Sequence, residues 1–251
     1  MRYWPYLIIF VLTPFFVQSQ TLEQRQAGWF IQANIGVCQP QADWSKRFGT
    51  FGEAGVGFGY KTASGWLFGL EGAFLFGNKV KEDPLYELRT SEGFVISQNG
   101  TPSSLTVQQR GLKLPWLKAG KIFHKTYGRK ASVNSGYVFQ LGGTYLQHII
   151  HYQKVSGGDV GQLRDEYKKG YDRLCSGFAL TESLGYMYLS NKRGMNFYAG
   201  LECMQGFTKS QRIDFNTQTR DNSRRLDMSI GFKVAWILPL LKRDENEEFY
   251  F

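Results

Sequence analysis

The chain has 251 residues, a length suited to one domain, and a formal net charge of +9. After residue 20 it contains no run of about 18 consecutive apolar residues, which excludes a membrane-spanning helix from that part of the sequence. Its three cysteines, Cys38, Cys175 and Cys203, are too widely spaced for a Cys-x-x-Cys metal site. Their disulfide state stays open between a Cys38–Cys175 bridge and free buried thiols.

Residues 1–19 have the features of an export signal. Arg2 supplies a positive charge, an apolar run extends from Leu7 to Val17, and Val17-Gln18-Ser19 resembles a cleavage site. The apolar run is too short to cross the roughly 30 Å of a membrane's hydrocarbon core as a helix. No cysteine directly follows the cleavage site, which argues against a lipoprotein anchor. We therefore expect a cleaved signal peptide and an exported chain.

Eight later segments place an apolar residue at every second position, the pattern of a strand with two different faces. In chain order they are 28–38, 50–60, 66–78, 106–122, 133–152, 176–189, 195–207 and 224–238. The last alternates from Leu226 to Leu238, whereas an ordinary strand has about 5–6 residues. Pro115 in the fourth segment predicts a bulge or an edge defect, since proline cannot donate to a ladder.

The connections between these segments alternate in length. Long polar connections cover 39–48, 79–105, 153–175 and 209–223, and short ones cover 61–64, 123–132 and 190–194. Long extracellular loops and short periplasmic turns are typical of outer-membrane barrels. We predict an all-β fold, an eight-stranded antiparallel transmembrane β-barrel over residues 20–238, integral to the outer membrane with periplasmic termini. A short periplasmic tail, 239–251, would follow.

A water-soluble barrel or sandwich is the competing fold, but its apolar face would point inward. Here the more polar face also carries most of the glycines, which fits a narrow and crowded lumen. That face carries five charged residues that we expect to meet as a structural ion lattice: Glu53, Glu71, Glu202, Asp227 and Lys233. Lys113 or Lys121 would join them. Buried carboxylates need such partners, so the lattice explains Glu53 and Glu71 without acid–base chemistry.

Catalytic and cofactor motifs have weaker support. His148 or His151, near the outer end of the fifth segment, could face Ser176 or Glu166 as in barrels that modify lipid A, but no motif links them. Gly55-x-Gly57-x-Gly59 falls inside a strand rather than at a strand–helix turn, so it predicts no nucleotide site. We expect no catalytic residue, no metal and no cofactor.

Charge and the last residues indicate partners. Basic residues gather in 167–173 and 209–225, where lipopolysaccharide phosphates would meet them, and nucleic acid does not suit an exported barrel. The chain ends in Phe249, Tyr250 and Phe251 after an acidic segment. These aromatic residues are interpreted as a docking peptide for a partner, as a displaced assembly signal, or as the end of a disordered tail.

Several motifs resemble a family of Bacteroidota outer-membrane proteins that form eight-stranded barrels. The matching residues are Glu92-Gly93-Phe94-Val95-Ile96, Gln109-Arg110-Gly111, Tyr167-Lys168-Lys169-Gly170-Tyr171-Asp172-Arg173-Leu174, Gly185-Tyr186-x-Tyr188-Leu189-Ser190-Asn191, Gly206-Phe207-Thr208 and Gly231-Phe232-Lys233-Val234-x-Trp236-x-Leu238-Pro239. The resemblance covers the mature chain and brings no catalytic residues. It implies an accessory barrel of the outer-membrane protein assembly machinery, or secondly of the type 9 secretion and gliding apparatus.

The combined reading is a non-enzymatic barrel that serves as a scaffold or accessory subunit of an envelope complex. The partners implied are a large barrel, surface lipoproteins and a peptidoglycan-binding protein, together with outer-membrane lipids. A lipid A-modifying enzyme and a narrow porin are the alternatives. An eight-stranded barrel leaves space only for its own side chains, which disfavours the porin.

Overall fold

The computed structural model describes residues 27–124, 134–164, 166–190 and 195–240. The expected signal peptide, 1–19, and the aromatic tail residues Phe249, Tyr250 and Phe251 lie outside these ranges. Within them, no helix combines the length and the apolar character needed to cross a membrane.

Eight long strands form the body of the molecule. They are β1 (Gly28–Gln41), β2 (Phe51–Lys61), β3 (Trp66–Gly77), β5 (Pro102–His124), β6 (Gly136–Ser156), β7 (Cys175–Tyr188), β8 (Asn196–Ser210) and β11 (Arg224–Leu240). They are hydrogen-bonded in the order β3-β2-β1-β11-β8-β7-β6-β5, and β3 pairs with β5 to close the ring. All these pairings are antiparallel. The predicted eight-stranded antiparallel barrel is confirmed, and β11 continues two residues past the expected boundary at 238.

The wall of the barrel has an apolar outside and a charged inside. Side chains of alternate residues are exposed on the outer face, and those between them are buried. Ile35, Val56 and Leu117 are 62%, 65% and 61% exposed, whereas Glu53, Glu71 and Lys233 are buried. This is the reverse of a water-soluble barrel, whose apolar side chains fill its interior.

A bulge in β5 reverses which residues face inward. Lys113 and Trp116 are both buried, and Leu114 and Pro115 between them are exposed. The register against β6 shifts at this point, so the bulge predicted from Pro115 is confirmed. Odd-numbered residues face the lumen before the bulge and even-numbered residues after it. Lys113 therefore points inward as expected.

The bulge also corrects the expectation for Lys121. Its side chain lies on the outer face, with Nζ 5.4 Å from the ring centroid of Trp66. Lys118 enters the lumen instead, because it follows the change of face. Alternation counted without the bulge gives the wrong face for every residue beyond Pro115.

The first long connection is not the polar loop predicted for 39–48. Helix α1 (Ala42–Arg47) folds into the mouth of the barrel and packs against β11. Trp44 and Phe48 are fully buried there, four positions apart, and cover the end of the lumen. The helix acts as a plug because an open mouth would leave the apolar lumen residues below it in water.

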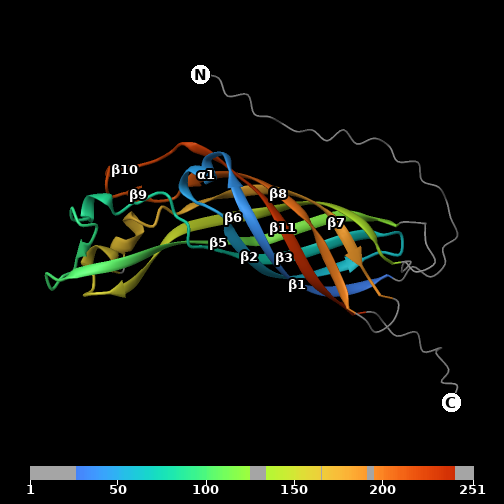
Figure 1. Ribbon diagram of the computed structural model, residues 1–251. Coiled ribbons are helices and arrows are strands. Elements are labelled where there is room, and N and C mark those ends of the chain that lie inside the picture. Colours follow the sequence, from blue (N-terminus) through green and yellow to red (C-terminus); the bar gives the residue numbers. More distant parts are fainter. Residues whose placement is uncertain (1–26, 125–133, 165, 191–194, 241–251) are drawn as a thin grey trace, which may run out of the picture.

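The other long connections lie beyond α1. Here β5 and β6 continue past their pairings with β3 and β7 as a two-stranded ribbon. The connections contain η1 (Tyr86–Leu88), β4 (Val95–Ile96), η2 (Gly161–Leu163), η3 (Tyr167–Gly170), β9 (Ile213–Asp214) and β10 (Thr219–Arg220). Figure 1 shows them gathered at one end of the barrel, the loop end; the opposite end, with the short connections, is the turn end.

Candidate functional site

Six charged residues meet inside the barrel in what we call the lumen ion cluster. Five different strands supply them: Glu53, Glu71, Glu202, Lys113, Lys118 and Lys233. All six side chains are buried, and the three carboxylates balance the three ammonium groups. Four of the five residues expected in the lattice are therefore brought together, and Asp227 is not among them.

The ammonium groups bridge carboxylates from different strands. Lys113 Nζ donates to Glu53 and lies 3.1 Å from Glu202 Oε1. Lys233 Nζ lies 2.9 Å from Glu71 Oε1 and 3.5 Å from both other carboxylates. Each buried charge thus has more than one partner of opposite charge, which offsets the free-energy cost of removing it from water.

Trp116 stands at the centre of the lumen ion cluster. The Nζ atoms of Lys113, Lys118 and Lys233 lie 4.6, 3.5 and 4.1 Å from its ring centroid, within cation–π range. Its Nε1 donates to Thr181 Oγ1 at 3.0 Å. Trp116 and Lys118 are not expected in the lumen from simple alternation. The signal that places them there is the two-residue step across Leu114 and Pro115.

Asp227 forms a separate polar contact nearer the loop end. It accepts hydrogen bonds from His148 Nε2 at 2.9 Å and Thr208 Oγ1 at 2.5 Å, and all three residues are buried. Trp44 of α1 covers the histidine, with ring centroids 5.3 Å apart. Asp227 is six positions from Lys233 on β11, roughly 20 Å along a strand, so one cluster could not include both.

The alternative catalytic site is not assembled from His148, Ser176 and Glu166. His148 points into the lumen, whereas Ser176 accepts a hydrogen bond from Tyr145 Oη at 2.7 Å. Glu166 is exposed and pairs with Lys169 in a loop. His148 and Ser176 lie on opposite faces of the wall and cannot form a nucleophile–base pair without moving.

Two apolar clusters close the lumen on either side of the ion cluster. The loop-end cluster includes Trp44, Phe48, Phe51, Leu75, Leu146 and Ile150. The turn-end cluster includes Phe30, Leu67, Ile122, Val138, Met187 and Tyr198. Buried side chains of the two clusters and of the lumen ion cluster therefore occupy successive levels of the interior.

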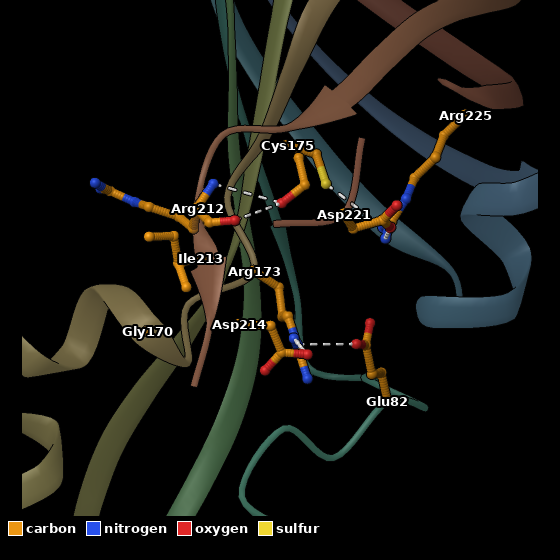
Figure 2. A pocket seen from close by; sticks show the side chains of 10 residues that line it. Glu82, Gly170, Arg173, Cys175, Arg212, Ile213, Asp214, Asp221 and Arg225 are labelled. Atoms are coloured by element: carbon orange, nitrogen blue, oxygen red, sulfur yellow. Dashed lines mark hydrogen bonds and ion pairs between the residues drawn. The ribbon is translucent and has the colours of Figure 1, made fainter. Parts of the chain in front are cut away.

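The loops form a second charged assembly around a cavity of about 150 Å³. Figure 2 shows Arg173 in this cavity between Asp214 and Glu82. Glu82 also accepts a hydrogen bond from Arg47 Nε at 2.6 Å, and Arg47 belongs to α1. Loops after β3, β6 and β8 are thus tied to one another and to the plug.

Residues 167–174, which carry the most specific motif of the sequence, lie at the centre of this loop assembly. The carbonyl oxygen of Tyr171 accepts from Tyr152 Oη, and that of Asp172 accepts from the Ile150 amide, both at 2.8 Å. The Gly170 carbonyl accepts from the Phe215 amide at 3.2 Å. Burial raises the pKa of the Asp172 carboxyl above its ordinary value. The motif therefore has a structural role, which is to hold neighbouring loops on the β5–β6 ribbon.

The cysteines and the described acidic residues add no further chemical site. All three cysteines are free thiols, so the Cys38–Cys175 bridge considered above is not formed. Among the described residues, no group of three His, Cys, Asp or Glu side chains is arranged to hold a metal ion.

Comparisons with known proteins return distant structural likenesses. No protein-family model matches the sequence, and no curated protein matches it. Neisserial surface protein A aligns with 12% identity and a TM-score of 0.42, covering 84% of this chain and 97% of its own. Ail, the attachment invasion locus protein of Yersinia pestis bound to sucrose octasulfate, aligns with 10% identity and a TM-score of 0.40, covering 85% and 99%. The outer membrane protein OprG from Pseudomonas aeruginosa aligns with 13% identity and a TM-score of 0.39, covering 85% and 97%.

Proposed function

We propose that the chain is an integral outer-membrane barrel and a non-enzymatic subunit of a multi-protein envelope complex. The observation that carries the membrane assignment is the predominantly apolar outer wall around a charged lumen. Exposed aromatic residues lie near the turn end, at Trp29, Trp66, Tyr137 and Trp236, and near the loop end, at Phe76, Tyr145, Phe178 and Phe207. Outer-membrane barrels have such girdles of aromatic residues at both membrane interfaces, on either side of an apolar band. The loops would then be extracellular and the termini periplasmic.

A scaffold role is supported by what the interior and the loops do. The ion cluster and the apolar clusters on either side of it favour neither a porin nor a large binding cavity, and ion pairs join the loops into one outer surface. The resemblance of its central motif to Bacteroidota barrels supports a subunit of the outer-membrane protein assembly machinery, with the type 9 secretion and gliding apparatus second. Lys209 and Arg224, paired across β8 and β11 at the loop-end rim, suit lipopolysaccharide phosphates.

The first test is a mild-detergent pull-down from the native outer membrane, followed by mass spectrometry. The affinity tag belongs beside Gly100, an exposed turn with open space around it, so that both chain ends stay free. We expect stoichiometric recovery of another integral barrel with lipoproteins or a peptidoglycan-binding protein. Recovery of the chain alone would contradict the subunit role.

The C-terminal tail can be tested separately. Truncation after Leu240 removes residues 241–251, including Phe249, Tyr250 and Phe251, and keeps β11 paired with β1. If the tail is the docking peptide, the truncated chain folds normally but loses its periplasmic partner. Loss of membrane insertion would indicate an assembly signal, and an unchanged complex would exclude both roles.

A further inference from the structure

Glu182 on β7 is an acidic residue on the outer, apolar face of the barrel. Its neighbours Thr181 and Ser183 are buried, and Thr181 contacts Trp116 in the lumen. Because successive strand residues point to opposite faces, Glu182 points outward. The next outward residues along the strand, Leu180 and Leu184, are 48% and 58% exposed.

The position of Glu182 is close to the middle of the apolar band. It is four residues from Phe178 toward the loop end and four from Tyr186 toward the turn end. Each interval spans about 13 Å of strand, or roughly 9 Å of height at a 45° tilt. A glutamate side chain is shorter than the Lys and Arg side chains that reach the headgroups from such depth.

No partner for this carboxylate exists in the part of the chain that the structure describes: no hydrogen bond or ion pair involves Glu182. Its cross-strand neighbours are Leu141 on β6 and Cys203 on β8, and Leu201 lies diagonally beside Cys203. Lys121, near the turn end, and Lys209 and Arg224, at the loop-end rim, lie far from this height on the outer wall.

Ionisable side chains inside a membrane are costly and mark functional contacts, usually with a charge of opposite sign. We propose that the face formed by Leu141, Leu180, Glu182, Leu184, Leu201 and Cys203, the Glu182 face, binds the transmembrane wall of another outer-membrane protein. That wall carries a lysine or arginine at mid-membrane height. The inference rests on the proposed subunit function and assigns it a lateral contact surface.

Charge complementarity selects this occupant over a second copy of the chain. A two-fold dimer through the Glu182 face would bring two Glu182 carboxylates together in lipid, with no cation at their height. A basic residue on a different protein would pair with the carboxylate and remove it from hydrocarbon.

The test uses the full chain in its own outer membrane, with a photo-crosslinking amino acid at Leu184. The matched control carries it at Val56 on β2, on the opposite wall and 65% exposed. We expect an adduct from the Leu184 position and none from the Val56 position. The partner peptide in the Leu184 adduct should be a membrane strand with a lysine or arginine. Glu182→Leu should reduce this adduct at least about tenfold, as expected when a desolvated charge pair loses one member. Glu182→Arg, combined with an acidic residue in place of the partner's lysine or arginine, should restore the adduct.

Three outcomes overturn the inference. These are a Leu184 adduct with a second copy of the chain, an adduct that persists unchanged in the Glu182→Leu protein, and no adduct while the pull-down still recovers the complex. The last refutes the Glu182 face and leaves the subunit function standing. A pull-down that recovers the chain alone removes both.

A stability measurement guards against a variant that fails to fold. In lipid vesicles without partners, Glu182→Leu should raise the urea midpoint of unfolding, because it replaces a lipid-facing carboxylate with an apolar group. Val56→Leu, an apolar exchange on the opposite wall, should leave the midpoint unchanged. A lower midpoint for Glu182→Leu would show that the carboxylate has a partner within the barrel, and would contradict the proposal.

Discussion

Lys113 shows how much one buried charge contributes to the barrel. Its ammonium serves two carboxylates, Glu53 and Glu202, and is fully buried. Lys113→Met leaves both short of a cation, and breaking a buried ion pair in this way costs about 3–5 kcal/mol. We expect that loss in the free energy of unfolding, measured by urea titration in vesicles. Lys121→Met, on the outer face, should change it by less than about 1 kcal/mol. Equal losses of stability in the two variants would contradict the placement of Lys113 in the lumen ion cluster and of Lys121 on the outer face.

Asp221 gives the loop assembly a defined pH dependence. Hydrogen bonds from Ser223 and the guanidinium of Arg225 lower the pKa of this carboxyl from 3.8 to about 2. A lowered pKa stabilises the loop above the unfolded value, and the contribution is lost as pH falls from about 4 to about 2. We expect the Asp221 carboxyl carbon to titrate near 2 by NMR, and Arg225→Gln to move the midpoint upward. An unchanged titration midpoint in Arg225→Gln would mean that the guanidinium does not influence the pKa of the Asp221 carboxyl.

At the scale of elements, a single substitution can test whether α1 is seated in the mouth of the barrel. Trp44 is fully buried between His148 and Phe51. Trp44→Ala should therefore lower the free energy of unfolding by about 3–5 kcal/mol, the range for truncating a buried aromatic side chain. Phe94→Ala, at an exposed loop position, should cost no more than about 0.5 kcal/mol. A small loss at Trp44 would show that the helix is not seated in the mouth.

The strands could be predicted from the sequence, but the short helix and the partners of the buried charges could not. All eight strands were found because a wall between two media enforces strict alternation, and Pro115 located the bulge. Helix α1 is not predicted from sequence because six residues are too few to show a helical period, and Trp44 is a single aromatic residue among polar ones. Lys118 was missed because the bulge changes parity. Which charged residues meet depends on register between strands, which a single sequence does not reveal, so Asp227 was grouped with the wrong set.

For the whole molecule, the membrane assignment predicts where charge is tolerated. Leu70 and Val234 lie on the outer wall, on β3 and β11. Leu70→Arg or Val234→Arg should each cost roughly 2–4 kcal/mol of stability in vesicles, the range for a basic residue near the membrane midplane. Glu92→Arg, in an exposed loop, should have little effect. Similar tolerance at all three sites would contradict a lipid-facing wall.

The two apolar clusters also determine how fast the interior communicates with solvent. Lys113, Lys233 and Trp116 lie between the two clusters, and their side chains are at most 6% exposed. We expect deuterium exchange at the ammonium groups of the two lysines and at the indole nitrogen of Trp116 to be slow, and to become faster when α1 or the turn end opens. Exchange rates at these three nitrogens would thus report how often the barrel opens. Trp44→Ala should raise these rates if the barrel opens at the mouth, and should leave them unchanged if it opens at the turn end.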